Sequence, residues 1–138
     1  MATWRDLVAF VRHGYEVIRF EPDEVRVRVR VHFAAVDVDD DERVQTVVLA
    51  REVLDRREEW VQIATPFARV GQVDLQAVLE EVGATTVVGG VVIMGDYLVL
   101  RHSLPLIHLD LNEFTDPVEL VATAADDLEQ RFTGHDDY

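Results

Sequence analysis

Residues 87–104 contain two apolar runs that are joined by the dipeptide Gly95-Asp96. A two-residue Gly-Asp link between strand-forming runs predicts a β-hairpin. Because side chains alternate across a strand, both faces of this hairpin would be apolar. One face would carry Val91, Ile93, Leu98 and Leu100, and the other Val92, Met94, Tyr97 and Val99. The helices of a small domain usually cover one face, so the second would need more of the chain, a second subunit or a ligand.

Four more strands are predicted before residue 71, over Tyr15–Phe20, Glu24–Phe33, Arg43–Leu54 and Glu58–Val70. In the second of these, valines at alternate positions share one face, while the other face carries Arg26, Arg28, Arg30 and His32. The arginine row could bind an anionic partner. It could also balance nearby acids and keep an exposed face from aggregating, which is the interpretation that we favour. Pro66 lacks an N–H group, so it predicts an edge or a bulge at its end of the fourth strand.

Three helices are predicted, one near each end of the chain and one in the middle. They are expected to begin at Thr3, Asp74 and Asp116, and to end at the glycines at positions 14, 83 and 134. Separate helices and hairpins, rather than alternating βαβ units, indicate an α+β fold with an antiparallel sheet. The predicted order is α-β-β-β-β-α-β-β-α, and 138 residues without repeats or linkers fit a single domain over residues 1–138.

Charge and composition exclude several classes of function. The formal net charge is −14, so phosphate backbones and anionic membranes would repel the chain, and neither nucleic acid nor membrane is expected as a partner. The absence of cysteine excludes disulfides and thiolate chemistry. All 13 basic residues are arginine, which excludes a Schiff-base lysine and a P-loop lysine. The sequence shows no signal peptide and no apolar run of membrane-spanning length, so a cytoplasmic location is expected.

Residues that could perform catalysis are few, and we expect no catalytic residue and no cofactor. Ser103 is the only serine, and its neighbour His102 would lie on the opposite face of a strand, where the two cannot form a nucleophile–base pair. An alternative is a small carboxylate- and histidine-based hydrolase or ligand-binding enzyme. In that case the side chains that would converge in a pocket are His108, Asp110 and Glu113.

Two groups of residues could in principle supply metal ligands, and we expect no metal site at either. The acidic turn over residues 37–42 resembles the start of an EF-hand loop, with acids at Asp37, Asp39 and Asp41. The glycine and the glutamate that such a loop needs further on are missing. The second group, which matches no ligand spacing of a known metal site, is His102, His108, His135, Asp136 and Asp137.

The region Val44–Gly134 resembles the YbjN-type family, whose members are described as bacterial sensory transduction regulators and share the fold of type III secretion chaperones. The features that carry the resemblance are the strand at Trp60–Val70 leading into the Asp74 helix, the Gly95-Asp96 hairpin, the segment SLPLIHLDL at 103–111 and AADDLEQRFTG at 124–134. The chaperone fold usually has three strands before its middle helix. The fourth strand predicted here is either an additional amino-terminal strand or a wrongly assigned segment.

The resemblance implies a binding module rather than an enzyme, often a homodimer that offers an apolar sheet or helix surface to a protein partner. This agrees with the two-faced hairpin inferred from the residue pattern. The leading hypothesis is therefore a non-catalytic, chaperone-like or regulatory interaction protein that binds a protein partner or a second copy of itself. The residues expected to form that surface are Val92, Met94, Tyr97 and Val99. Equally, the chain's own elements could cover this face.

Overall fold

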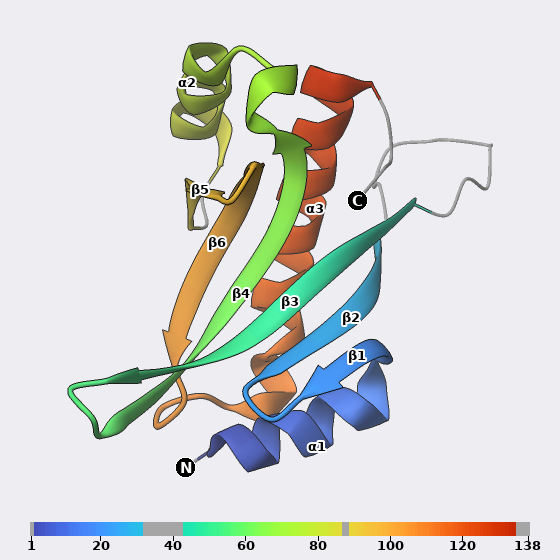
Figure 1. Ribbon diagram of the computed structural model, residues 1–138. Coiled ribbons are helices and arrows are strands. Elements are labelled where there is room, and N and C mark those ends of the chain that lie inside the picture. The colour runs from blue at the N-terminus through green and yellow to red at the C-terminus, as the bar shows by residue number, and fades with distance from the viewer. Residues whose placement is uncertain (1, 32–42, 87–88, 135–138) are drawn as a thin grey trace.

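The computed structural model describes residues 2–31, 43–86 and 89–134 and contains one antiparallel sheet with helices packed on it (Figure 1). The strands lie in the order β1-β2-β3-β4-β6-β5. The helices and strands are α1 (Trp4–Gly14), β1 (Glu16–Glu21), β2 (Glu24–Val31), β3 (Arg43–Leu54), β4 (Glu58–Arg69), α2 (Leu75–Thr85), β5 (Gly90–Met94), β6 (Tyr97–Pro105) and α3 (Thr115–Thr133). This confirms the predicted α+β class and the order of its elements, including four strands before the middle helix.

Capping confirms some of the predicted helix ends and corrects others. At the start of α1, Thr3 and Asp6 form a capping box: Thr3 Oγ1 accepts from the Asp6 N–H at 3.2 Å, and Asp6 Oδ2 accepts from the Thr3 N–H at 3.0 Å. Gly134, at a φ of +71°, ends α3 as expected.

The other two glycines do not end their helices in the expected way. Gly14 is the last residue of α1, and extended backbone at Tyr15 ends the helix, so Gly14 does not adopt the left-handed conformation that a glycine commonly takes just after a helix. Gly83 lies inside α2, which continues to Thr85. The third helix begins two residues earlier than predicted: Asp116 was expected as the cap before the first helical residue, whereas Phe114 takes that position, directly after the 3₁₀ turn at Leu111–Glu113.

The core lies between the sheet and α3, which runs along one face of it (Figure 1). The alternating valines of β2 point into this core, as the pattern predicts. From α3 the core receives Val118, Val121, Ala122, Ala125 and Leu128. Helix α1 adds Trp4, Leu7 and Val11 beside β1 and β4. Both helices therefore cover the same face of the sheet, and burial of apolar surface there is the main stabilising term.

The pairing of β3 with β4 ends at Val48 and Ala64, although both strands continue beyond that point. Farther along, β4 contains a register shift between Pro66 and Ala68, which confirms the bulge predicted from the missing proline N–H. Because the two strands diverge here, the sheet loses backbone hydrogen bonds between them. This divergence opens the sheet on the face opposite α3.

Candidate functional site

The hairpin of β5 and β6 has the predicted register. Its turn is Gly95-Asp96 with a φ of +61° at Gly95, and Val92 pairs with Val99 and Met94 with Tyr97. On one face of the hairpin, Leu98 and Leu100 are fully buried in the core beneath α3. The β6 half of this face is therefore covered by the chain itself, whereas Ile93 on the β5 half is 55% exposed.

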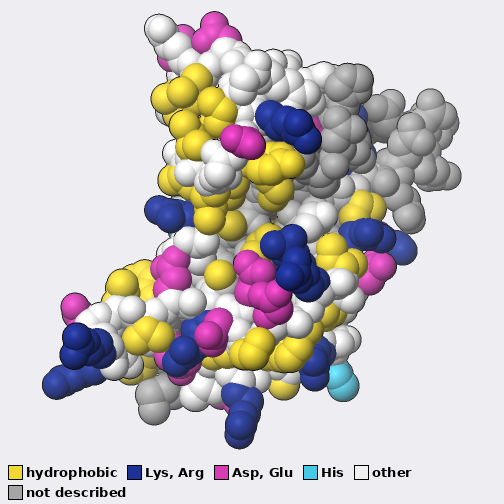
Figure 2. All heavy atoms as spheres, viewed as in Figure 1, with side chains coloured by type: hydrophobic (Ala, Val, Ile, Leu, Met, Phe, Trp, Pro, Cys, Tyr) yellow, Lys and Arg dark blue, Asp and Glu magenta, His cyan; other side chains and the backbone are white. Residues whose placement is uncertain are grey.

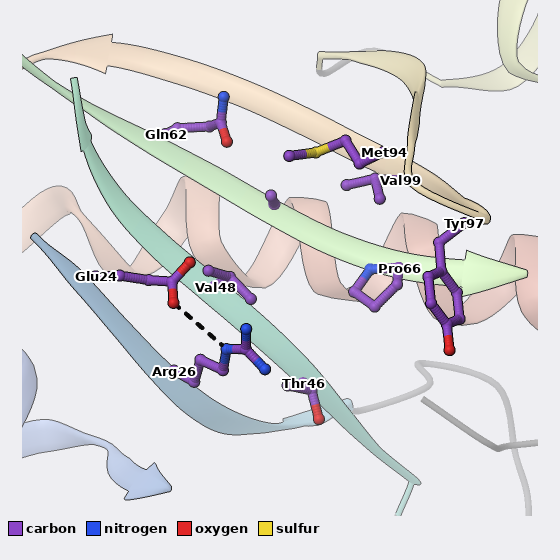
Figure 3. A pocket seen from close by; sticks show the side chains of 10 residues that line it. Glu24, Arg26, Thr46, Val48, Gln62, Pro66, Met94, Tyr97 and Val99 are labelled. Atoms are coloured by element: carbon purple, nitrogen blue, oxygen red, sulfur yellow. Dashed lines mark ion pairs between the residues drawn. The ribbon is translucent and has the colours of Figure 1, made fainter. Parts of the chain in front are cut away.

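The second face of the hairpin belongs to the face of the sheet that points away from α3, here called the open face. A hollow of about 460 Å³ lies on it (Figure 3). Its lining residues come from five strands: Glu24, Arg26, Thr46, Val48, Gln62, Ala64, Pro66, Met94, Tyr97 and Val99. In the part of the chain that the structure describes, no helix lies in front of this hollow (Figures 1 and 2).

Three of the four residues predicted as an interaction surface line this hollow, namely Met94, Tyr97 and Val99. Val92 lies on the same face, half-buried on the outer strand. Val99 is only 6% exposed because its neighbours in the sheet surround it, whereas Met94 is 45% exposed. The predicted interaction surface is thus neither internal core nor fully exposed to solvent. Its residues form part of the floor and one side of the hollow.

Sequence reasoning missed the other half of the hollow. Val48 of β3 and Ala64 and Pro66 of β4 form much of its floor. The strands themselves were predicted, but a strand pattern does not say where two neighbours will separate. The available signal was Pro66, whose predicted bulge lies at the hollow.

The arginine row of β2 lies on the open face, but only Arg26 lines the hollow. Arg26 Nε lies 3.6 Å from Glu24 Oε2, and Arg28 Nη1 lies 3.5 Å from Glu16 Oε1. These long, partly exposed ion pairs contribute little to stability. They agree with the favoured interpretation, in which the row balances nearby acids, and binding of an anionic partner stays a prediction.

The open face differs in charge from the chain as a whole. Strand register and alternation place the following charged residues of the described strands on it: Arg19, Arg26, Arg28, Arg30, Arg69, Arg101, Glu16, Glu21, Glu24, Glu52 and Glu58. Arginines and glutamates are therefore nearly balanced here, in a chain whose formal net charge is −14. Among the described residues, the acidic excess lies outside these strand positions.

The alternative catalytic group lies away from the open face, around a second, broad depression of about 480 Å³. His108 and Asp110 line it together with Asp6, but Glu113 does not. Both carboxylates already serve as caps. Asp110 Oδ1 accepts from the Asn112 N–H at 3.0 Å, and Asp6 caps α1. The depression is therefore lined by one histidine and by two acids whose carboxylates already accept hydrogen bonds from backbone N–H groups.

The other candidate residues do not come together as a site. Gln62, which lines the hollow, pairs with Ser103, whereas His102 pairs with Ile63, so the serine and histidine lie on opposite faces as predicted. Among the described residues, no group of three or more histidines and acids is placed to hold a metal ion. The acidic turn at 37–42 and the residues His135, Asp136 and Asp137 lie outside the described part.

A patch of exposed apolar residues lies at the β5 end of the sheet. Ile93 is 55% exposed on β5, and Leu79 is 49% exposed on the neighbouring helix α2. Figure 2 shows hydrophobic side chains gathered over these two elements. β5 is an outer strand without charge or proline, whereas the opposite outer strand, β1, carries charges and a register shift. An apolar outer strand of this kind favours pairing with another chain.

No helix within residues 2–31, 43–86 and 89–134 combines the length and the apolar character needed to cross a bilayer. Comparison of the sequence with protein-family models finds no match, and comparison with curated proteins finds none either.

Proposed function

We propose that this protein is a non-catalytic interaction module, chaperone-like or regulatory, whose open sheet face binds a protein partner. The observation that carries the proposal is the hollow itself. It is concave, has an apolar floor of Val48, Pro66 and Val99, and lies on the face opposite the one that α1 and α3 bury (Figure 1). Concave apolar surfaces of this kind are typical of binding sites.

The shape and chemistry of the hollow favour a polypeptide over a small substrate. Five strands contribute to it, so it spreads across the face of the sheet rather than enclosing a ligand. One of its polar side chains is already engaged, because Gln62 Nε2 donates to Glu52 Oε1 at 2.6 Å. The mechanism is burial of partner side chains against the apolar floor, with no covalent step.

We also propose that the protein is a homodimer, with the second copy packing at the β5 end of the sheet. Ile93 and Leu79 expose apolar area there, and β5 is the outer strand of the sheet that the described residues form. A second copy that covers these groups would remove both features from water. The open face would then stay available to the partner.

Filling the hollow tests the proposal. Ala64 lies on its floor, so Ala64→Arg should place a long charged side chain inside it. Leu120→Arg is the matched control, because Leu120 is 54% exposed on α3, on the other side of the sheet. Tagged proteins purified from the native cell should bring down a partner with wild type and L120R but not with A64R. Equal recovery with all three proteins, each with a wild-type circular dichroism spectrum, would contradict the proposal.

A further inference from the structure

The partner's chemistry can be read from the hollow, and this inference rests on the function proposed above. The floor is apolar, and Val48, Ala64 and Val99 leave room there for an aliphatic or aromatic side chain. Above the floor stands one cationic group, the Arg26 guanidinium, shown in Figure 3 beside Glu24. A ligand that fills the hollow must meet both features.

Arg26 has an unused hydrogen-bond donor. Its Nε atom is buried and makes no hydrogen bond with the described residues, and Oε2 of Glu24, with which it forms an ion pair, lies 3.6 Å away. A buried donor without an acceptor is unfavourable, so an acceptor supplied by a ligand would be stabilised. The guanidinium presents Nε and a terminal nitrogen side by side, which matches the two oxygens of a carboxylate.

The charges around the hollow also favour an acidic ligand. Arg28 and Arg30 continue the row on β2, and strand register places Arg69 and Arg101 on the opposite side of the hollow, on β4 and β6. These cations lie on both sides of the apolar floor, on a face where arginines and glutamates are nearly balanced, whereas the described residues elsewhere carry an acidic excess. An acidic segment would therefore be repelled less by the open face than by the rest of the described surface.

We propose that the open face recognises an acidic, apolar segment of a partner chain in extended conformation. One apolar side chain of the segment occupies the floor between Val48 and Val99, and a neighbouring aspartate or glutamate displaces Glu24 and accepts from Arg26. Alternation of side chains in an extended segment allows it to offer an apolar and an acidic side chain at neighbouring positions.

Selection from a random displayed-peptide library tests this even while the partner is unidentified. Peptides would be selected for binding to the wild-type protein and then tested on the Ala64→Arg variant. Only peptides that bind the wild type but not the variant would be kept. The kept peptides should combine acidic and apolar residues. The affinity of the best peptide, and of its analogue with Asn and Gln in place of Asp and Glu, would then be measured on wild type, Arg26→Gln and Arg28→Gln.

On wild type, the neutral analogue should bind at least tenfold more weakly than the acidic peptide. Arg26→Gln should weaken the acidic peptide at least tenfold and leave the neutral analogue within about twofold. Arg28→Gln is the matched control, because Arg28 lies on the same strand face outside the hollow, and it should change either affinity by less than threefold. Thermal melting of each variant excludes loss of fold as the cause.

The outcomes separate the two proposals. The kept peptides could lack acidic residues, or the wild type could bind the acidic peptide and its neutral analogue equally. Either result would overturn the proposal that the segment is acidic, while the open face would remain a binding site. If no peptide distinguishes wild type from Ala64→Arg, the proposed function fails with it. If no peptide binds but decanoate binds in a way that depends on Arg26, the ligand of the open face is a small amphiphilic carboxylate. That result would overturn the proposal of a partner segment.

Discussion

The hydroxyl of Thr65 donates to the backbone oxygen of Thr46 at 2.8 Å, just beyond the point where β3 and β4 stop pairing. Beside it, the fully buried Gln45 donates through Nε2 to the backbone oxygen of Pro66 at 3.0 Å. Two side chains thus replace part of the backbone ladder that the diverging strands lose. They link the strands where these separate and pair both carbonyl oxygens, and the hollow lies on the open face, opposite these two side chains.

Thr65→Val should lower the free energy of unfolding by about 1–2 kcal/mol, because it removes a buried hydrogen bond while keeping the shape of the side chain. Urea denaturation measures the change. Thr123→Val on α3 is the control, and it should shift the free energy by less than about 0.5 kcal/mol. A Thr65→Val protein as stable as wild type would show that this bond does not hold the strands.

Gly89→Ala should destabilise the protein by at least about 2 kcal/mol, since two costs combine there. Gly89 has a φ of +67°, and a Cβ at this position would lie 2.1 Å from the backbone oxygen of Arg101. Gly71→Ala is the comparison, because a Cβ there meets nothing within 4 Å. Thermal melting of both variants gives the contrast, and equal melting temperatures would refute the predicted close contact between Gly89 and β6.

Stability should fall as the pH rises from about 10 to about 12, in part because of Tyr15. Burial, with the nearby charges of Glu119 and Asp116, raises the pKa of Tyr15 from 10.0 to about 12. The folded state therefore keeps this proton over a range in which the unfolded chain releases it, so the contribution is full below pH 10 and is lost as the pH passes 12.

Tyr15→Phe removes this titration, and the difference in unfolding free energy between wild type and variant should change across that pH range. At neutral pH the variant should be about as stable as wild type, because the buried Tyr15 hydroxyl makes no hydrogen bond with the described residues. Urea unfolding at several pH values checks both statements. A constant difference from pH 9 to 12 would show that the Tyr15 pKa is not raised.

Ile93→Lys should convert a dimer into a monomer, since it places a charge on the outer strand where the second copy is proposed to pack. Light scattering at several protein concentrations measures the mass, with Leu120→Lys as a control of similar exposure on α3. A wild-type protein that stays monomeric at high concentration would reject the homodimer, and a dimeric Ile93→Lys protein would place the interface elsewhere.

Residue periodicity was enough to predict most of the fold. The alternating valines of β2, the Gly95-Asp96 turn and the apolar spacing of α3 each depend on local pattern, and each element formed where that pattern placed it. Helix ends were less predictable. Gly83 can be accommodated inside α2 because a glycine permits, but does not impose, a left-handed conformation.

The candidate site could be predicted only in part. Alternation placed Met94, Tyr97 and Val99 on one face, and they do line the hollow together. The contribution of Val48 and Ala64 depends on where β3 and β4 separate, and that depends on tertiary hydrogen bonds of Gln45 and Thr65. Such bonds join residues about 20 positions apart, which local periodicity does not report.

The most direct test of the account is photocrosslinking from the two sides of the sheet. A benzophenone amino acid would replace Met94, which lines the hollow and is 45% exposed, or Leu120, which is 54% exposed on α3. After irradiation in the native cell, position 94 should yield a specific adduct to another protein, and position 120 should yield none. Adducts from position 120 alone, or the same adducts from both positions, would contradict the claim that the open face carries the interaction.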